Sequence, residues 1–435
     1  MEYRLSKLVS YRNYPDFTVL INHADHSEFQ MNVDAGIILD KIESGNTEFS
    51  KEELDFIEEL SKYGLIISED ANQQEETQIN ADLLDIETPE NSIYNSIKEY
   101  ASQNLLSIGC LMELTYLCAL DCKHCYLKGT PVIPKEELST QEIKNFIDDY
   151  KKIGGLFLTF TGGDPFMRED FFEIFSYARK NRFAITIMTS GYKVDHKLLE
   201  KMARMGVYHF QASIYGPDAA VHDKFTGRAG SFDYAMNAIK IMRKNNVPAR
   251  AAVSINKANE QHYDAIVKSL REENIPFGIN FIMMPARTGD KTSEMLNVDD
   301  DTLTTCLSKI SKTHDPPRMG EIDNPDSPLC DAGRVIFSVD PFGTIYPCME
   351  IREEAAGSIR EDKLENIWKN SSVLNHVRGL KFKDLKDCPN CELRPWCNRC
   401  TGNSVVDGQG YTGHSHWDCR YAKHLKAAQE LDEST

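Results

Sequence analysis

The chain has 435 residues, enough for two to four domains around a large buried core. Hydrophobic residues make up 41% and charged residues 27%, a composition typical of a soluble globular protein. The formal net charge of −18 argues against nucleic acid or anionic lipid as a general partner. No apolar run reaches membrane-spanning length and no signal-peptide core is found, so we expect a cytoplasmic protein without membrane attachment.

The 12 cysteines are concentrated in the later part of the chain. None precedes Cys110, and most of the others fall in tight groups. In a cytoplasmic protein, such groups indicate metal binding or redox chemistry and not a disulfide framework. Cys110 lies outside every group, so we expect it to be a small buried residue.

Residues 1–70 have the pattern of a small separate domain. Two short strands are predicted at residues 17–22 and 28–33, with a polar turn between them. Two amphipathic helices follow, and capping residues mark their ends. These are Asp34 and Gly45 for the first helix, and the Ser50–Glu53 capping box and Gly64 for the second. This order predicts a winged-helix-like α+β domain.

Residues 71–107 are predicted to be a linker and a bridging helix. The stretch 69–90 contains acidic residues but no Lys or Arg, which is typical of a solvated tether. A short helix is predicted at about residues 92–104, directly before the first cysteine group.

Residues 108–288 alternate between short apolar runs and amphipathic helices. The runs are residues 111–117, 156–160, 184–188, 207–213, 249–255 and 277–282. The helices are residues 140–153, 170–181, 196–205, 232–244 and 261–273. Six strand–helix units predict a parallel sheet, but they are too few for a closed eight-stranded barrel. We therefore predict a partial (β/α)6 barrel with its chemistry at the carboxyl ends of the strands.

Three cysteines follow the first predicted strand in a CxxxCxxC pattern, namely Cys118, Cys122 and Cys125. Thiolates suit Zn, Cu(I) and Fe–S centres. Three of them are one short of the usual four, so a cluster held by this group would keep one iron open. The spacing also suits a zinc knuckle whose fourth ligand comes from elsewhere, and the pattern alone leaves this alternative open.

Small and polar residues follow the next strands. Gly162 and Gly163 allow close backbone approach, and the Asp164 carboxylate can accept from a cation. Together with the cysteine pattern, these residues resemble the radical S-adenosylmethionine (SAM) superfamily, whose partial (β/α)6 barrel agrees with the predicted fold. The resemblance implies a [4Fe–4S] cluster on the three cysteines and SAM contacts from His124, Gly162, Gly163, Asp164, Thr189, Ser213 and Asn256.

The chain departs from the family pattern at three positions, which follow two of these strands. Asp164 stands where the family has Glu, and Tyr215 and Thr226 replace the usual Asp and Arg. In the family, His124 occupies an aromatic position that stacks on adenine. His222 either has a direct role or only satisfies nearby backbone groups, and both interpretations remain open.

A second cysteine series occupies residues 330–435 and resembles the C-terminal SPASM extension of this superfamily. Its spacing is shortened between Cys397 and Cys400, as in thioether-forming peptide maturases of the sactipeptide or ranthipeptide type. The resemblance implies two auxiliary [4Fe–4S] clusters. The distal cluster would use Cys388, Cys391, Cys397 and Cys419, and the proximal cluster would use Cys330, Cys348 and Cys400. The fourth proximal ligand is either Cys306, from the bridging region 289–329, or a substrate thiolate at an open site. Zinc ribbons with the same CxxC pairs are the alternative.

The layout of residues 1–70 resembles the PqqD-like recognition element of enzymes that modify ribosomal peptides. The resemblance implies that a precursor's leader peptide binds by adding a strand to the sheet edge. A winged helix that binds DNA, or that only packs on its neighbour, is the alternative, and the acidity of the chain argues against DNA.

These features predict a radical SAM maturase that cross-links a precursor peptide, by a thioether from Cys sulfur to carbon, using a 5′-deoxyadenosyl radical. Its partners would be the precursor and an electron donor such as flavodoxin or ferredoxin. The alternatives are a C–C cross-linking enzyme, a peptide epimerase, a small-molecule SPASM dehydrogenase and, in a different class, a zinc-binding adaptor. The sequence does not identify the substrate, the catalytic acid or base, or the oligomeric state.

Overall fold

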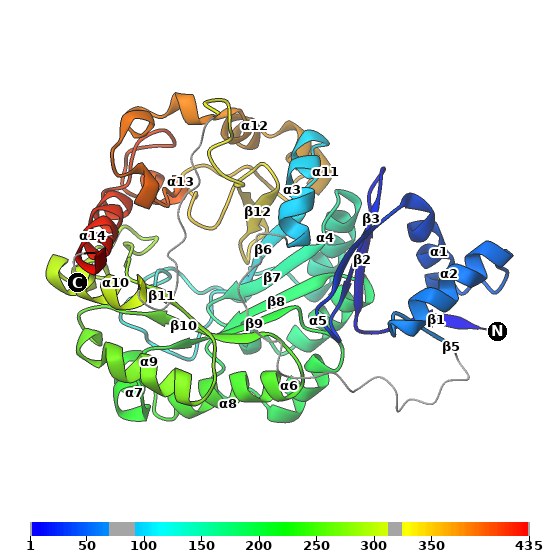
Figure 1. The fold of residues 1–435 in the computed structure, drawn as a ribbon, viewed down its shortest axis with the longest axis horizontal. Coiled ribbons are helices and arrows are strands. Elements are labelled where there is room, and N and C mark those ends of the chain that lie inside the picture. The colour runs from blue at the N-terminus through cyan, green and yellow to red at the C-terminus, as the bar shows by residue number, and fades with distance from the viewer. Residues whose placement is uncertain (1, 69–91, 312–323, 434–435) are drawn as a thin grey trace.

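The computed structural model describes residues 2–68, 92–311 and 324–433, so the predicted acidic linker and part of the bridging region lie outside the described residues. A large sheet with helices around it occupies the centre of the molecule (Figure 1). The small N-terminal domain lies on one side of this sheet, and the loop-rich C-terminal region lies above it. None of the described helices is long and apolar enough to cross a membrane.

The central sheet has nine strands in the order β11-β10-β9-β8-β7-β6-β12-β13-β14. Its first six members in chain order are parallel and adjacent, as predicted for a partial barrel. They are β6 (Gly109–Thr115), β7 (Phe157–Gly162), β8 (Ala184–Thr189), β9 (His209–Ile214), β10 (Ala249–Ser254) and β11 (Phe277–Asn280). Each lies within about three residues of its predicted position.

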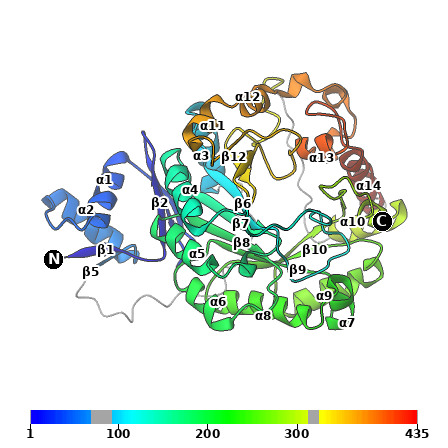
Figure 2. The ribbon, with the colours of Figure 1, turned by 180° about the vertical axis from the view of Figure 1, so that it is seen from behind.

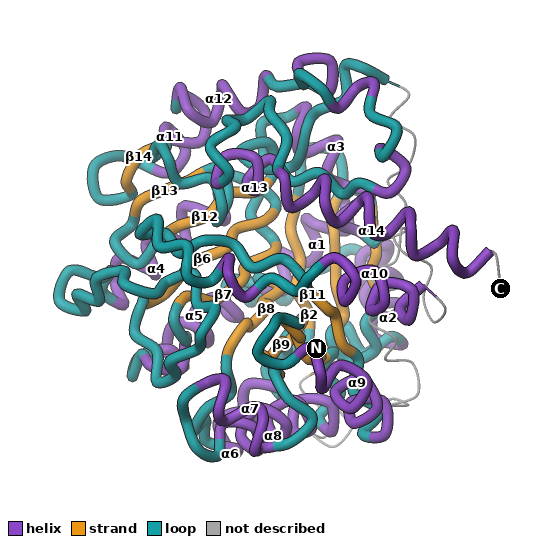
Figure 3. Tube along the Cα trace, turned by 90° about the vertical axis from the view of Figure 1, so that its left-hand side faces the viewer, coloured by secondary structure: helices purple, strands orange, loops and turns teal. Residues whose placement is uncertain are grey.

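Helices connect these strands around the outside of the sheet, as expected for right-handed crossovers (Figure 2). They are α4 (Thr140–Lys152), α5 (Phe171–Lys180), α6 (His196–Ala203), α7 (Ala219–Thr226), α8 (Ser231–Lys244) and α9 (Tyr263–Glu272). The strands lie in the interior of the molecule, with most helices outside them (Figure 3). Helix α7 was not predicted, because the eight residues after β9 have too few apolar positions to show a helical period.

Alternate residues of each strand face the helices, and the others face the interior of the barrel. On β6, Cys110, Met112 and Leu114 belong to the main hydrophobic core. Leu111 and Glu113 therefore point to the opposite face. The same alternation gives the barrel interior a half-buried polar lining, from Thr159, Thr186, Gln211, Ser213 and Ser254.

The N-terminal domain combines two small sheets and two helices. Its elements are β1 (Tyr3–Leu5), β2 (Val9–Asn13), β3 (Thr18–Asn22), β4 (Glu28–Met31), α1 (Val33–Glu43), α2 (Lys51–Lys62) and β5 (Ile66–Ser68). Strands β2, β3 and β4 form one antiparallel sheet, and β1 pairs with β5. Strands β1, β2 and β5 were not predicted, because two of them are three residues long and their pairing depends on tertiary contacts.

The capping predictions for α1 and α2 are confirmed except at one position. The capping box of Ser50 and Glu53 is present, and Gly45 and Gly64 have positive φ values of 76° and 65°. Asp34 was wrong as the N-cap of α1. The N-cap is Asn32, whose side chain accepts from the backbone N–H of Ala35 at 3.0 Å, and Asp34 lies in the first turn.

Three arginine contacts, one buried and two partly buried, fix the N-terminal domain to the barrel. Arg12 donates to the Gly155 carbonyl at 2.5 Å, Arg179 donates to Lys7 at 2.8 Å, and Arg182 donates to Ser6 at 2.7 Å. Gly155 and the Arg179–Arg182 turn precede β7 and β8, so the domain sits at the amino ends of the barrel strands. The cysteine loop follows β6 and therefore lies at the opposite edge.

The C-terminal region extends the barrel sheet. Strand β12 (Ile336–Val339) pairs in parallel with β6, and β13 (Thr344–Tyr346) and β14 (Gly357–Ser358) continue from it. The remaining α-helices among the described residues are α3 (Ile93–Gln103), α10 (Asp300–Ser311), α11 (Leu364–Asn370), α12 (Ser372–Gly379), α13 (Thr401–Val406) and α14 (His416–Glu433). The parallel β12–β6 pair places the second cysteine series directly beside the strand that leads to the first.

Candidate functional site

The loop after β6 brings Cys118, Cys122 and Cys125 together. Burial raises the pKa of the Cys122 thiol, and the thiols of Cys125 and Cys118 raise it further. Burial also raises the pKa of Cys118 to about 11, opposed by the backbone N–H of Leu120 and reinforced by Asp164 and Cys125. The three sulfurs therefore act on one another, and a bound metal must displace their protons.

The donor set at this loop fits an iron–sulfur cluster. All 12 cysteines are free thiols. Among the described residues, no three His, Cys, Asp or Glu side chains converge as ligands of a single metal ion. Three thiolates are one short of the four that usually hold a cluster, so this donor set fits an iron–sulfur cluster with one open iron.

Backbone contacts fix the direction in which the loop leaves β6. The N–H groups of Gly163 and Asp164 donate to the carbonyls of Thr115 and Leu117 at 2.8 and 3.0 Å. A Cβ atom built on Gly163 would lie 2.4 Å from the Leu117 oxygen, and one on Gly162 would lie 2.3 Å from the Thr115 oxygen. Only glycine fits at these two positions, so the Gly-Gly turn acts directly on the cysteine loop.

Asp164 ties together the ends of β7 and β8. Its buried carboxylate accepts from the Thr189 hydroxyl at 2.9 Å and from the backbone N–H of Ser190 at 2.9 Å. The Ser190 hydroxyl and the Phe166 N–H also donate to it. Burial raises its pKa, and the Ser190 and Thr189 bonds oppose that shift. The shorter Asp side chain is thus anchored by Thr189 and Ser190 at the end of β8.

His124 lies in an aromatic cluster. Its ring centroid is 4.9 Å from that of Tyr215 and 5.1 Å from that of Phe225. Its Nδ1 atom is buried and has no hydrogen-bond partner in the described part of the chain. Burial lowers the pKa of His124 to about 4, so its ring is neutral. An adenine contact of His124 stays a prediction.

The interpretation of His222 as a structural residue agrees with its contacts. It is 1% exposed, and its Nδ1 accepts from the Tyr215 N–H at 3.1 Å. Asn256 is also fully buried, and both atoms of its amide group bind nearby backbone, donating to Ser254 and accepting from Ala258. Asn256 therefore shapes the turn after β10. Ser213 is half-buried on the interior face of β9 and stays a candidate SAM contact.

The four cysteines assigned to the distal cluster lie close together. Burial, Asp418 and Cys419 raise the pKa of the Cys397 thiol to about 12, and Cys388 and Cys391 raise it further. Burial raises the pKa of Cys419 as well, followed by Cys388 and Cys391. Cys419 lies in the first turn of α14, apart in sequence from the other three, so this grouping depends on tertiary folding.

The three proximal cysteines form a second group. Burial raises the pKa of Cys348 to about 12, and Cys400 contributes to that rise. Cys330 and Cys348 both pack on one small apolar cluster, that of Ala332, Ile351, Val377 and Val405. Both ligand assignments stay predictions that this grouping supports.

The structure places Cys306 in a different environment. It is 4% exposed inside α10, in the main core, and its carbonyl accepts from the Tyr263 hydroxyl at 3.4 Å. The charged groups that act on its thiol are Lys309 on the same helix, and Asp264 and Glu260 at the start of α9 and just before it. Burial in the main core argues against Cys306 as the proximal ligand, and the choice between Cys306 and an open site stays a prediction.

Sequence comparison identifies the two parts of the chain that carry these cysteines. Residues 112–270 match the radical SAM superfamily, and residues 330–401 match an iron–sulfur cluster-binding domain, SPASM. The chain is a radical SAM enzyme. A non-catalytic zinc adaptor is therefore not the explanation for its cysteines.

Curated relatives fall into more than one activity class. The chain is 28% identical over 327 residues to an AdoMet-dependent heme synthase of Methanosarcina barkeri, covering 68% of this chain and 91% of the relative. It is 27% identical over 280 residues to the mycofactocin maturase MftC of Mycolicibacterium smegmatis, covering 61% and 71%. Identity at this level does not decide which of these two activities this chain shares.

Solved structures show the same fold over more of the chain. Streptococcus suis SuiB bound to its precursor peptide SuiA aligns with a TM-score of 0.61 at 14% identity, covering 96% of this chain and 99% of that chain. The enzyme anSMEcpe with bound AdoMet and a peptide aligns with a TM-score of 0.57 at 14% identity, covering 75% and 98%. The alignment with SuiB therefore includes most of the N-terminal domain.

The sequence interpretation missed a charged group beside the cysteine loop. Glu113 lies on the interior face of β6 with 0% exposure and contacts Arg287 and Arg352. One signal was present, because a lone carboxylate stood inside an otherwise apolar run. Its partners are 174 and 239 residues away in sequence, and no local pattern connects them.

Proposed function

We propose that this enzyme modifies a ribosomally synthesised precursor peptide and forms a thioether between a Cys sulfur and a carbon atom. The observation that carries the proposal is the fold similarity to SuiB, which covers the N-terminal domain as well as the barrel and the SPASM domain. The match to the heme synthase covers 68% of this chain. A domain beyond the catalytic unit suits a substrate that is recognised away from the reacting bond.

Cys118, Cys122 and Cys125 would hold the SAM-binding cluster, and SAM bound there supplies an adenosyl radical that removes hydrogen from an unactivated carbon. The remaining requirements fall to the protein. The Gly162–Gly163 turn and Asp164 would orient SAM, and the barrel interior would hold the target carbon close and exclude water. The seven thiols between Cys330 and Cys419 would hold two auxiliary clusters, which suits a reaction that oxidises its product.

A tetrapyrrole or another small molecule is the second candidate substrate, favoured by the heme synthase relatives. The lining of the barrel argues for the peptide. The half-buried positions of β7, β8 and β9 include, beside Phe157, Met188 and His209, the hydroxyl and amide side chains of Thr159, Thr186 and Gln211. Such groups can hydrogen-bond a peptide backbone, whereas a flat macrocycle requires broad apolar walls.

Mass spectrometry distinguishes these reactions. We expect that co-expression with the correct short peptide, chosen from those encoded beside this gene, removes two hydrogen atoms per cross-link. Alkylation of the product with iodoacetamide should then miss one Cys per cross-link, because a thioether sulfur cannot react. A two-hydrogen loss with every Cys still alkylated would indicate a C–C bond. An unchanged mass with altered stereochemistry would indicate epimerisation. If no peptide changes, the peptide proposal is wrong.

Leader recognition requires a test that leaves the domain in place. Tyr14, Phe17 and Val19 share a hydrophobic core with residues of the barrel strands and α3, so deleting residues 1–70 would expose that core. A point substitution avoids this problem. A hollow between α1 and α2 is lined by Ile37, Ile38 and Phe56, beside the end of edge strand β4, and Ile37 is 50% exposed.

We expect Ile37→Glu to weaken leader binding by roughly tenfold, or about 1.4 kcal/mol, because it buries a charge against the docked peptide. The matched control is Leu54→Glu on α2, where Leu54 is 40% exposed and does not line this hollow. Fluorescence anisotropy with a labelled synthetic leader measures both. Equal affinity of the two variants would contradict the placement of the leader at this hollow.

A further inference from the structure

A single buried carboxylate joins the two cysteine-bearing parts of the molecule. Glu113 Oε1 lies 2.8 Å from Arg287 Nη2, and Glu113 Oε2 lies 2.6 Å from Arg352 Nη2. The Tyr126 hydroxyl also donates to Oε1 at 3.1 Å. The Arg287 and Arg352 side chains are only 17% and 14% exposed, so little water screens the group.

Each partner of Glu113 belongs to a segment next to a cysteine group. Tyr126 directly follows Cys125, and its carbonyl accepts from the Arg287 N–H at 2.9 Å. Arg352 donates through Nε to the carbonyl of Met349, the residue after Cys348, at 2.9 Å. Arg287 also lies within 3.4 Å of that carbonyl. The network therefore spans from the SAM-cluster loop to the proximal auxiliary loop.

A buried ion-pair network contributes little net free energy to the stability of a fold. Ion pairs lose most of their Coulomb gain to desolvation, and apolar residues of similar volume often replace them without loss. Removing one partner is far more costly, since it leaves buried charge without compensation. A fully buried Glu shared by two guanidinium groups therefore indicates a requirement for geometry or charge at this place.

We infer that Glu113 is a positioning residue. Through Arg287 and Arg352, its carboxylate fixes the SAM-cluster loop relative to the proximal auxiliary cysteines and sets the local charge at both. The inference rests on the proposed cluster ligands but not on the identity of the substrate. Charges and hydrogen bonds near a cluster shift its reduction potential, so the charge at Glu113 has a measurable consequence.

The test measures cluster potentials by EPR-monitored redox titration of anaerobically reconstituted full-length protein. In Glu113→Gln, a negative charge disappears beside both loops, and we expect the potentials of the SAM cluster and the proximal cluster to shift positive. In Arg352→Gln, a positive charge disappears beside Cys348, and we expect the proximal potential to shift negative. Potential shifts of opposite sign in the two variants indicate an electrostatic role, because loosened packing does not predict the sign of a shift.

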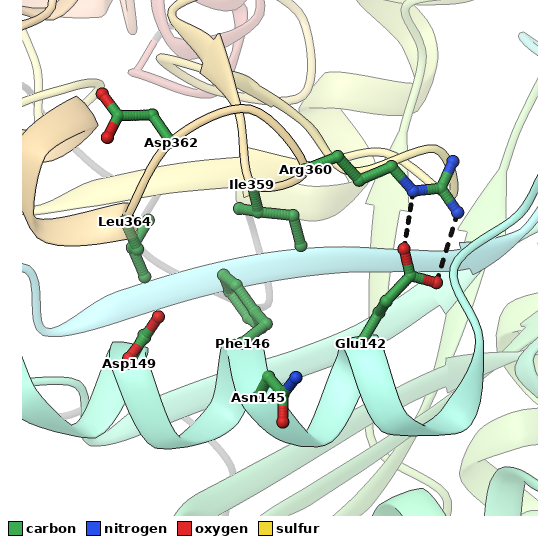
Figure 4. Close-up of a pocket in the computed structure, with 8 residues that line it drawn as sticks. All are labelled: Glu142, Asn145, Phe146, Asp149, Ile359, Arg360, Asp362 and Leu364. Carbon is green, nitrogen blue, oxygen red and sulfur yellow. Dashed lines mark hydrogen bonds and ion pairs between the residues drawn. The ribbon is translucent and has the colours of Figure 1, made fainter.

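The chain offers a matched control at the same domain boundary. Arg360, in the segment after β14, pairs with Glu142 on α4 at 2.7 Å, but both side chains are more than a third exposed (Figure 4). We expect Arg360→Gln to leave both potentials unchanged, because water screens this pair.

Outcomes of this test separate the inference from the cluster assignment. Wild-type protein without two distinguishable reducible clusters would defeat the assignment itself. Fully loaded Glu113→Gln with wild-type potentials would overturn the inference. If Glu113→Gln does not fold, the proximal potential of Arg352→Gln tests the inference instead. Arg287 still neutralises the Glu113 charge in that variant, so we expect it to fold. A proximal potential that stays unchanged or rises in Arg352→Gln would refute the charge effect.

Discussion

Replacing Cys118, Cys122 and Cys125 together by alanine is expected to abolish SAM cleavage. The three thiols act on one another in the loop after β6, and SAM would bind at the open iron of the cluster that they would hold. Chromatography of 5′-deoxyadenosine formed with dithionite measures the loss. Iron content should fall by about four atoms per chain of about 12, if each cluster holds four irons.

Cys110→Ala is the control for this triple variant. Cys110 lies on the same strand but is 4% exposed in the main core, on the face opposite the barrel interior. We expect it to keep full iron content and SAM cleavage and to lose about 1 kcal/mol of stability through the small cavity. Retained SAM cleavage in the triple variant would show that SAM binds elsewhere.

Gly163→Ala is expected to reduce SAM cleavage by roughly 100-fold, because a displacement of about 1 Å at a reacting centre has effects of this size. The added Cβ would lie 2.4 Å from the Leu117 oxygen and 2.6 Å from the Tyr116 oxygen. Both are backbone atoms at the entry to the cysteine loop, so the loop itself must move. Overpacking should also cost about 1–3 kcal/mol in the free energy of unfolding.

The matched control is Gly278→Ala on β11, where a Cβ atom meets nothing within 4 Å. We expect Gly278→Ala to have wild-type cleavage rates and unchanged stability within about 0.5 kcal/mol. Steady-state rates of 5′-deoxyadenosine formation and chemical denaturation compare the two variants. If both glycine variants behave alike, the Gly-Gly turn does not control the position of the cysteine loop.

Local sequence patterns predicted the barrel well. Its six strands alternate or cluster apolar residues in short runs, and five of its helices have a helical apolar period. The capping box at Ser50 and the glycine stops at Gly45 and Gly64 were equally readable, since each depends on interactions within a few residues. The N-cap of α1 was misplaced by two residues, because Asn32 and Asp34 are both good capping residues and the sequence does not show which of them caps the helix.

The single SAM contacts stay predictions, although the hydrogen bonds of two polar residues favour a role in shaping turns. Asn256 and His222 both carry polar groups that suit a ligand, but their side chains bind nearby backbone in the folded chain. A residue type at a strand end does not reveal whether it faces the ligand or shapes the turn. Cys306 is a similar case, because its burial in the main core within α10 depends on tertiary packing that its sequence context does not reveal.

The sequence by itself determined the chemistry of this protein, since cysteine spacing and glycine turns are short-range requirements of a cluster and its cofactor. Only the tertiary structure decided how distant parts meet. Strand β12 joins β6, the arginines place the N-terminal domain opposite the cysteine edge, and Glu113 binds Arg287 and Arg352. Pairings across more than 140 residues leave no local period, because they depend on how helices and strands pack and not on the order of neighbouring residues.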